Sequence, residues 1–524
     1  MLPSADLILN NARLITLDVR APRAEALAIR GHTIAAVGSN LEITGLISRH
    51  TRVMDCKGMC LIPGFNDAHI HLLPTAATLT GLDCGPGAIA SVSDLQQRLR
   101  LRAANTAPGH WIRGFGYDHL SLADGRHPTR CDLDEATDRH PVRIDHRSGH
   151  AIVLNSLGME LAGISRDTPD PVEGIIERDA ATGEPTGLFL EAAEFLRTRL
   201  GVTRHQSDFT EGIRRLNNLL LSYGITSVQD AGPNNDLSRW KTFQQLRQSQ
   251  HLRSRVTMMA GASNLDEFWT PVLSWGEGDN GLRLGHAKIM LTLTTGALNP
   301  GVDELRDLVV HCHELGFPVA IHAVEQEAVE AATRALTEVG PCSSSLDGND
   351  RIEHCGECPP QLIDAVLAAG VTVVTQPGFI YWNGDAYVER VENTMLPHLY
   401  PVGALSRAGV PIAFGSDSPV IDANPWAAIA GAVTRITKTW KVFPDSTGSG
   451  NSHNLTVMEA LRMHTLGGAL AEGTGSMKGT LTPGKLADMV LLDADPTAIN
   501  ETDLSKVRNI ATIIGGEVVW DSGA

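Results

Sequence analysis

The sequence predicts an α/β fold: a (β/α)8 barrel of the TIM type, a small composite β domain and an inserted subdomain. Three observations lead to this prediction. Apolar segments of strand length alternate with helical segments through the middle of the chain. Both ends of the chain read as short strands separated by turns. A long interval after the first barrel strand carries strand signals of its own.

The chain has the size and composition of a large globular protein. Its 524 residues exceed one modest core, and 42% hydrophobic with 20% charged residues is ordinary for this class. The 60 acidic and 43 basic residues give a net charge of −17, and no Lys/Arg-rich run is present. A surface for nucleic acid or for an anionic membrane is therefore not expected.

The N-terminal stretch MLPSADLILNNARLITLDVR favours a cytoplasmic protein, because polar residues interrupt it where a signal peptide or membrane anchor would be apolar. The eight cysteines are scattered, as in proteins with reduced thiols. Cys355 and Cys358 form a C-x-x-C. A zinc ribbon needs a second such pair, so a structural role is expected for these two cysteines.

The two ends of the chain are expected to complete one β domain, with residues 1–62 as its N-terminal part and 478–524 as its C-terminal part. Each part contains β-rich segments, such as ADLILNNARLITLD and NIATIIGGEVVWD. Asn10-Asn11 and Gly515-Gly516 stand where hairpin turns belong.

Residues 63–477 are expected to form the (β/α)8 barrel. Its eight parallel strands are predicted from apolar segments at residues 61–71, 224–232, 253–261, 282–291, 316–323, 350–355, 370–377 and 409–419. Helical patterns lie between several of them, for example at 302–315 and 360–369. In such a barrel the active site lies at the C-terminal ends of the strands.

The interval between His71 and the strand at 224–232 is far longer than one helix and its loops need. It contains the strand-like segments GHWIRGFGYD, HPVRIDHRSGHAIVLNS and GIIERDAATGEPTGLFLE. We expect residues 75–205, approximately, to form a subdomain inserted on the active-site face of the barrel.

The stretch LIPGFNDAHIHL places His69 and His71 two residues apart at the end of the first predicted strand. Alternate residues of a strand point to one face, so the two imidazoles would converge there. Such a pair is either part of a metal site or two polar residues at a strand end. The other strand ends favour the metal, because further candidate ligands fall at equivalent positions there. These are Lys288, His322, His354 and Asp417.

A second His-x-His motif, at His311 and His313, lies in a helical pattern. Residues two apart on a helix do not share a face, so we reject this pair as metal ligands.

The motifs resemble those of the amidohydrolase superfamily, and most closely its family-3 branch, which includes the N-substituted formamide deformylases. The similar stretches run almost end to end: PGFNDAHIHL, GITSVQDAG, AKIML, IHAVEQEAV, RIEHC, GSDSPV and KGTLTPGKLADMVLLDADP. Within the predicted insert, SGHAIVLNSLGMELAGI looks like a signature of that branch. The resemblance implies a metal-dependent hydrolase.

The resemblance also implies a metal site formed by His69, His71, Lys288, His322, His354 and Asp417. In the family zinc is the usual occupant, and a carboxylated lysine bridges two metals. Many branch members follow the strand-four lysine with Asp-Gly, whereas this chain reads KIMLTLTTGAL. The resemblance therefore leaves open whether one or two ions bind.

Lys288 lies in the apolar stretch GHAKIMLTL, where a free ammonium group would be unfavourable. Burial lowers the pKa of a lysine, and the neutral amine can react with carbon dioxide to give an anionic carbamate. The alternative is an ion pair with a carboxylate such as Asp417.

The expected reaction is hydrolysis of a non-peptide C–N bond of the amide, formamide or carbamate type by a metal-activated hydroxide. Asp417 is the expected catalytic residue, which passes a proton from water to the leaving group, as its counterpart does in the family. The alternatives are a deaminase or cyclic-amide hydrolase on the same site, and a non-catalytic binding protein on the same fold. Neither a G-x-S-x-G elbow nor a P-loop motif is present, which disfavours covalent and nucleotide-dependent routes.

The expected partner is a small-molecule substrate with an apolar or aromatic group, and homo-oligomer formation is left open. Tyr381 and Trp382, in PGFIYWNGDAY after the seventh strand, are candidate substrate-binding residues, as is Phe379. Ordinary packing would explain these aromatic residues equally well. His150, in the predicted insert, is a further candidate for contact with the substrate, and a core or surface histidine is the alternative.

Overall fold

The computed structural model of the chain describes residues 4–171, 174–201, 206–268, 273–293, 296–342, 349–444 and 454–523. Two compact units are present. Met1–His71 and Asn217–Ala524 form one, and Leu72–Leu216 form the other. Among the described residues, no helix is both long enough and apolar enough to cross a lipid bilayer.

The first unit contains a nearly closed parallel barrel of eight strands, and these are the eight strands that the sequence predicts. In sheet order they are β8 (Phe65–Ile70), β15 (Ile225–Asp230), β16 (Arg255–Gly261), β17 (Leu282–Met290), β18 (Val319–Ala323), β19 (Arg351–His354), β20 (Thr372–Thr375) and β21 (Ile412–Phe414). The last strand meets the first at their carboxyl ends. There the N–H of Asp417 donates to the carbonyl of His69 at 2.7 Å, and the N–H of His71 donates to the carbonyl of Ser418 at 2.9 Å.

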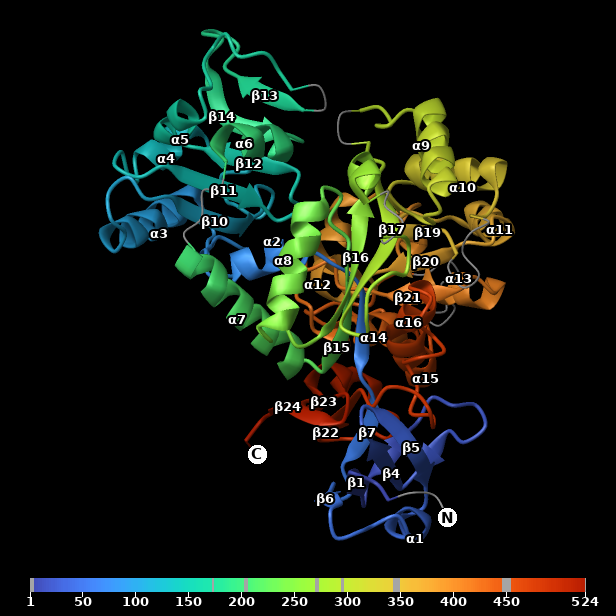
Figure 1. Ribbon diagram of the computed structural model, residues 1–524. Coiled ribbons are helices and arrows are strands. Elements are labelled where there is room, and N and C mark those ends of the chain that lie inside the picture. The colour runs from blue at the N-terminus through green and yellow to red at the C-terminus, as the bar shows by residue number, and fades with distance from the viewer. Residues whose placement is uncertain are drawn as a thin grey trace. The chain divides into compact units, whose positions relative to one another are not determined.

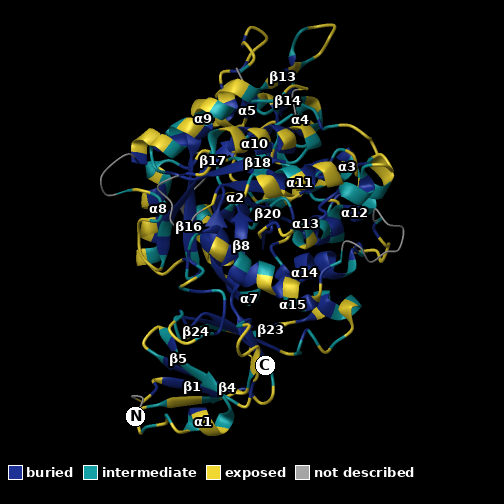
Figure 2. Cartoon of the chain, turned by 90° about the vertical axis from the view of Figure 1, so that its right-hand side faces the viewer, coloured by how far each residue is buried: buried dark blue, intermediate teal, exposed yellow. Residues whose placement is uncertain are grey.

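Helices surround the barrel and turn their apolar sides inward. They include α8 (Leu237–Gln248), α9 (Val302–Glu314), α10 (Gln326–Val339), α11 (Pro360–Ala368), α12 (Gly378–Arg390), α13 (Val402–Ala408), α14 (Pro425–Thr434), α15 (Val457–Arg462) and α16 (Gly468–Ala471). Figure 2 shows buried strands inside a layer of helices whose outer sides are exposed. In α10, for example, Ala328, Ala332 and Leu336 repeat every four residues and are all buried.

Strands from both ends of the chain share one six-stranded sheet in this unit, in the order β24-β23-β22-β7-β2-β3. Its members are β2 (Arg13–Ile15), β3 (Arg23–Ala24), β7 (Cys60–Pro63), β22 (Met489–Leu492), β23 (Asn509–Ile514) and β24 (Glu517–Asp521). A four-stranded sheet lies beside it, with β1 (Leu7–Asn10), β4 (Ala26–Arg30), β5 (Thr33–Gly38) and β6 (Arg52–Asp55). Figure 1 shows the blue N-terminal and red C-terminal strands side by side, and Leu61 of β7 pairs with Leu491 of β22. The predicted fold class, with its composite β domain, is confirmed.

The two predicted hairpin turns have different outcomes. Gly515 and Gly516 do connect paired strands, because Ile514 of β23 faces Glu517 of β24 and both glycines have positive φ. The prediction for Asn10-Asn11 is wrong. Strand β1 pairs with β4 and β6, whereas β2 pairs with β3 and β7 in the other sheet. Asn11 has a φ of 51°, but this bend carries the chain from one sheet to the next.

The second unit is built on a six-stranded sheet in the order β13-β14-β12-β11-β10-β9. Its strands are β9 (Leu82–Asp83), β10 (Ile112–Tyr117), β11 (Val142–His146), β12 (Ala151–Leu154), β13 (Ile175–Arg178) and β14 (Pro185–Leu190). Helices of the unit are α2 (Leu72–Thr78), α3 (Val92–Ala104), α4 (Arg130–Asp134), α5 (Ser156–Leu161) and α6 (Ala193–Leu200). Helix α7 (Gln206–Ser222) contains the boundary between the two units, after Leu216. Strands β9, β10 and β11 are parallel, and the remaining pairs are antiparallel. The predicted insert at 75–205 lies within this unit, and its placement on the active-site face of the barrel stays a prediction.

Candidate metal centre

The predicted ligands lie at the carboxyl ends of the barrel strands. His69 belongs to β8, Lys288 to β17, His322 to β18 and His354 to β19. His71 directly follows β8, and Asp417 lies three residues beyond the end of β21. Parallel strands of a barrel direct such residues to one region. The candidate ligands, which come from motifs far apart in the sequence, therefore lie in one region of the barrel.

His69, His71 and Asp417 form the core of this region. Oδ1 of Asp417 lies 3.1 Å from Nε2 of His71 and 3.5 Å from Nε2 of His69. One nitrogen or oxygen atom from each of the three residues can be chosen so that all lie within 4.8 Å of one another. Two imidazole nitrogens and one carboxylate oxygen are a donor set that zinc and similar divalent ions prefer.

The other two histidines extend the same group. The ring of His354 lies 4.7 Å from that of His69 and 4.4 Å from that of His322, measured between centroids. His69 and His354 are buried, and His322 is partly exposed. The structure thus brings the four predicted histidines and Asp417 together, although their role as ligands stays a prediction.

Lys288 is buried in the same region, with 2% of its surface exposed. Burial lowers the pKa of its amine to about 8, against the opposing effect of the carboxylates of Glu353 and Asp417. Its Nζ makes no hydrogen bond within the described part of the chain. The ion pair with Asp417, which was the alternative for this lysine, is not formed among the described residues.

Hydrogen bonds fix which nitrogen of His69 and His354 can bind a metal. Nδ1 of His69 pairs with the carboxylate of Glu353, and Nδ1 of His354 lies 2.8 Å from Oε1 of Gln376. Both partners accept hydrogen bonds, so each Nδ1 carries the proton and each Nε2 presents a lone pair. These two Nε2 atoms are buried and make no hydrogen bond with any described residue. Buried polar atoms without partners are rare, and a metal bound here would satisfy both.

Glu353 is itself held by a buried cation. Nε of Arg351 donates to Oε1 of Glu353 at 2.8 Å, and the same guanidinium donates to the carbonyl of Ala68 at 2.8 Å. Arg351 and Glu353 are both fully buried. The arginine balances the carboxylate and ties β19 to β8, which places Glu353 against His69.

Backbone conformation explains how Glu353 and His354 both reach the centre although they are consecutive. Neighbouring residues of a regular strand point to opposite faces. His354 has a φ of 71°, which ends the strand and turns its side chain, and Asp417 has a φ of 57°. Such conformations are unfavourable for residues other than glycine and concentrate at functional sites.

The charge states suit metal binding near neutral pH. Burial lowers the pKa of His69 and of His354, so both imidazoles are neutral. Burial alone would raise the pKa of Asp417, but the surrounding histidines, first of all the hydrogen bond from His71, hold it below its usual range. Asp417 is therefore an anion beside neutral imidazole ligands.

Sequence reasoning did not identify Glu353, Gln376 and Arg351. A signal for two of them exists, because Arg351 and Glu353 alternate on a strand and so share the inward face. Gln376 follows β20, and its pairing with His354 depends on a contact between separate strands.

The predicted substrate residues of the barrel unit lie on one helix. Tyr381 and Trp382 belong to α12. Phe379 is 5% exposed and belongs to an apolar cluster against which Trp382 packs. Tyr381 lines a recess together with Trp440. Binding of substrate by Tyr381 and Trp382 stays a prediction.

His150 lies in the second unit, where its Nδ1 is 2.9 Å from a carboxylate oxygen of Glu191. Its proposed contact with substrate also stays a prediction. The rejected pair His311 and His313 is helical as predicted, and Nε2 of His313 lies 2.9 Å from Asp350. Cys355 and Cys358 are buried free thiols, in keeping with a structural role.

Comparisons with known proteins agree with this geometry. The sequence model of the amidohydrolase family matches residues 52–520. The N-substituted formamide deformylase of Arthrobacter pascens is 29% identical to this chain, and the alignment covers 98% of each protein. An uncharacterized metal-dependent hydrolase from Pyrococcus horikoshii OT3 matches with a TM-score of 0.76 and 25% identity over 95% of this chain and 99% of that one. A second, from Pyrococcus furiosus, matches with a TM-score of 0.71 and 25% identity over 94% and 99%.

Proposed function

The chain belongs to the amidohydrolase family, and from this premise we propose that it hydrolyses an amide, formamide or carbamate bond in a small substrate with an apolar or aromatic group. Family membership and the deformylase relative make it a metal-dependent hydrolase of C–N bonds other than peptide bonds. The bond type and the substrate are the finer part of the proposal.

The observation that carries the proposal is a set of buried nitrogen atoms without hydrogen-bond partners around an ionised carboxylate. Nε2 of His69, Nε2 of His354 and Nζ of Lys288 are buried and make no hydrogen bond among the described residues. Two neutral imidazoles with an unprotonated, buried Nε2, next to Asp417, fit a divalent cation better than any purely structural role. His69, His71, His322, His354 and Asp417 would hold it, and zinc is the proposed ion.

Lys288 is proposed to bind as its carbamate. The amine is buried, and its lowered pKa leaves a neutral fraction that can attack carbon dioxide. The reaction forms an N–C bond and releases one proton, and the carbamate carries one negative charge shared by two oxygens. Those oxygens can bridge two cations, so this modification favours a two-ion centre over a one-ion centre.

A divalent metal at this site would polarise the carbonyl of the substrate and lower the pKa of a water molecule beside it. The carboxylate of Asp417 accepts the proton of the attacking water and delivers it to the leaving nitrogen as the C–N bond breaks. Glu353 holds the tautomer of His69 throughout, because its carboxylate keeps the proton on Nδ1. The products are a carboxylic acid and an amine; a carbamate would give an amine and a carbonic acid half-ester, which loses carbon dioxide to leave an alcohol.

The formyl group is the favoured acyl group, because the deformylase relative is similar over nearly its whole length. Wild-type protein should be assayed with formyl, acetyl, carbamoyl and cyclic amides that carry matched benzyl and alkyl groups. We expect the highest kcat/KM for an open-chain formamide with an aryl group. Turnover of cyclic amides or of aminated heterocycles alone would refute the proposed bond type, while leaving the metal centre intact.

The cytoplasm is the proposed location. All eight cysteines are free thiols, seven of them buried. Reduced cysteines in this number are typical of proteins that work in a reducing compartment.

A further inference from the structure

A second group of candidate metal ligands lies in the other unit, at the carboxyl edge of its parallel strands. Asp118 and His119 directly follow β10, and His146 is the last residue of β11. These strands are parallel neighbours, and Tyr117 pairs with His146 in their register. Polar side chains that follow adjacent parallel strands meet at one edge of a sheet, which is where such sheets commonly bind ligands.

The distances within this group match a metal site. Nδ1 of His119 lies 3.3 Å from Nε2 of His146, and Oδ1 of Asp118 lies 3.9 Å from the same Nε2. A single atom from each of the three residues can be chosen so that all lie within 4.8 Å of one another. Around a tetrahedral zinc with bonds of about 2.0–2.1 Å, neighbouring ligand atoms are roughly 3.3–3.5 Å apart. The distance between His119 and His146 lies in this range, and the oxygen of Asp118 lies slightly farther from His146.

Other contacts orient the two imidazoles. The ring of His127 stacks on His119 with centroids 3.8 Å apart and planes 19° from parallel, and Nδ1 of His127 lies 2.9 Å from the hydroxyl of Tyr117. Nδ1 of His146 accepts the backbone N–H of Ser148 at 3.1 Å and lies 2.8 Å from Oγ of the same serine. Nε2 of His146 therefore faces His119 and Asp118, and binding of a cation there would require the proton to move to Nδ1, where Oγ of Ser148 can accept it.

The carboxylate of Asp118 divides its two oxygens between different partners. Oδ2 accepts from the hydroxyl of Ser121 at 2.9 Å and from the guanidinium of Arg147 at 3.3 Å. Oδ1 accepts from the N–H of Leu120 at 3.0 Å and keeps a lone pair on the side of His146. The arginine therefore does not compete for the oxygen that faces the imidazoles.

We propose that Asp118, His119 and His146 bind a divalent transition-metal ion, separate from the ions of the barrel centre, with water completing its coordination. Two imidazoles and one carboxylate favour zinc or a similar ion over calcium or magnesium, which require more oxygen ligands. The ion would join the ends of β10 and β11. The alternative is a set of hydrogen bonds, in which Nε2–H of one histidine donates to Nδ1 of the other.

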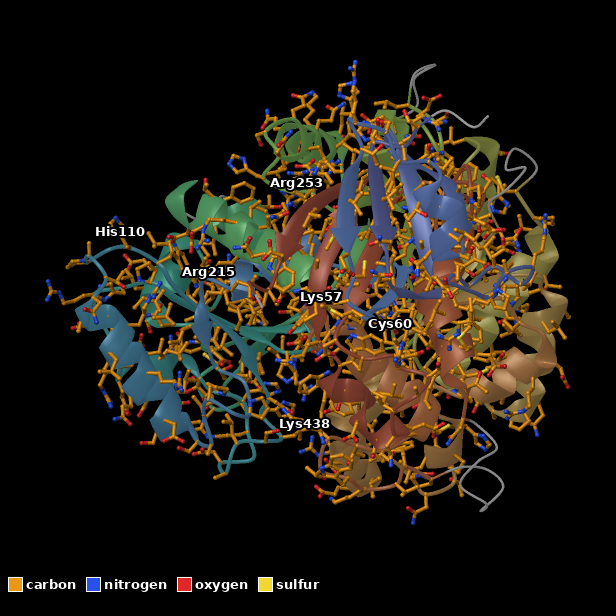
Figure 3. All side chains as sticks on the ribbon, turned by 90° about the horizontal axis from the view of Figure 1, so that it is seen from below. Lys57, Cys60, His110, Arg215, Arg253 and Lys438 are labelled. Atoms are coloured by element: carbon orange, nitrogen blue, oxygen red, sulfur yellow. The ribbon has the colours of Figure 1, made fainter. Side chains whose placement is uncertain are left out.

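The test is the number of zinc ions bound by the metal-free full chain, measured by titration calorimetry. We expect His119→Gln and His146→Gln each to bind one ion fewer than the wild type. His110→Gln, a matched change at an exposed histidine of the same unit (Figure 3), should bind as many ions as the wild type. The same loss of one ion should occur when His71→Ala has weakened the barrel centre.

Equal ion counts in the wild type and in both folded glutamine variants would overturn the proposal in favour of the hydrogen-bonded cluster. Circular dichroism identifies variants that do not fold. If a glutamine variant does not fold, the ion count of Asp118→Asn, which retains the hydrogen bonds with Leu120 and Ser121, is compared with that of the wild type instead. This result is independent of the proposed reaction, because His71→Ala affects only the barrel centre.

Discussion

Replacement of Asp417 by Asn is expected to lower kcat by about 10²-fold or more while the fold is kept, because an amide cannot carry the proton from water to the leaving nitrogen. Asparagine has nearly the same shape and can still pair with Nε2 of His71, which is 3.1 Å from the carboxylate. KM should change less than kcat, since the lost interaction acts mainly in the transition state. Steady-state kinetics of Asp417→Asn at saturating metal measure this effect.

Glu353→Gln is the matched control, because it makes the same carboxylate-to-amide change one hydrogen bond further from the reacting atoms. Glu353 contacts Nδ1 of His69, so its loss should weaken metal binding by roughly 10–100-fold and leave kcat nearly normal once metal is saturating. If Asp417→Asn has near-normal kcat with metal bound, Asp417 is not the proton carrier.

Lys288→Ala is expected to lose at least one equivalent of metal and to lower kcat/KM by about 10²-fold or more, because several kcal/mol of charge stabilisation at the reacting carbonyl are lost. The physical basis is the amine's lowered pKa of about 8, which burial causes. At pH 7 about a tenth of such an amine is neutral and can react with carbon dioxide, against roughly one in 2,500 for an ordinary lysine. Metal content and kcat/KM of the purified variant are the measurements.

Added formate, acetate or propionate should restore part of the metal and part of the activity of Lys288→Ala by occupying the position of the carbamate. Lys478 is the contrasting lysine, since it is 7% exposed and its Nζ lies 2.7 Å from Glu472. Replacement of Lys478 by Ala removes an ion pair. Small carboxylates should not restore any metal content or activity that this variant loses. Full metal content and a wild-type rate in Lys288→Ala would assign this lysine a structural role only.

The barrel could be predicted from the sequence because its signals are local. Each strand is a short apolar run, and each candidate ligand stands where its run ends, as with His69 in β8 and His354 in β19. Gly515-Gly516 is a similar local signal, since two glycines with positive φ suit a tight hairpin.

The features that could not be predicted depend on contacts between distant segments. Glu353 reaches His69 from a strand far along the chain, and Asn11 bends between two sheets whose strands come from several segments. His119 and His146 are close only because β10 pairs with β11. The sequence around each histidine gives no indication of this pairing. The positive φ of His354 lets two consecutive residues reach one site. It could not be predicted either, because only glycine commonly signals a positive φ in a sequence.

The most direct test of the central claim is the metal content of active wild-type protein, followed through removal by a chelator and return of Zn²⁺. The account predicts at least one stoichiometric divalent ion, bound by the barrel residues His69, His71, His322, His354 and Asp417. Activity should fall as the chelator removes this ion and should recover when Zn²⁺ is added back. Active protein without stoichiometric metal, or full activity after its removal, would contradict the account.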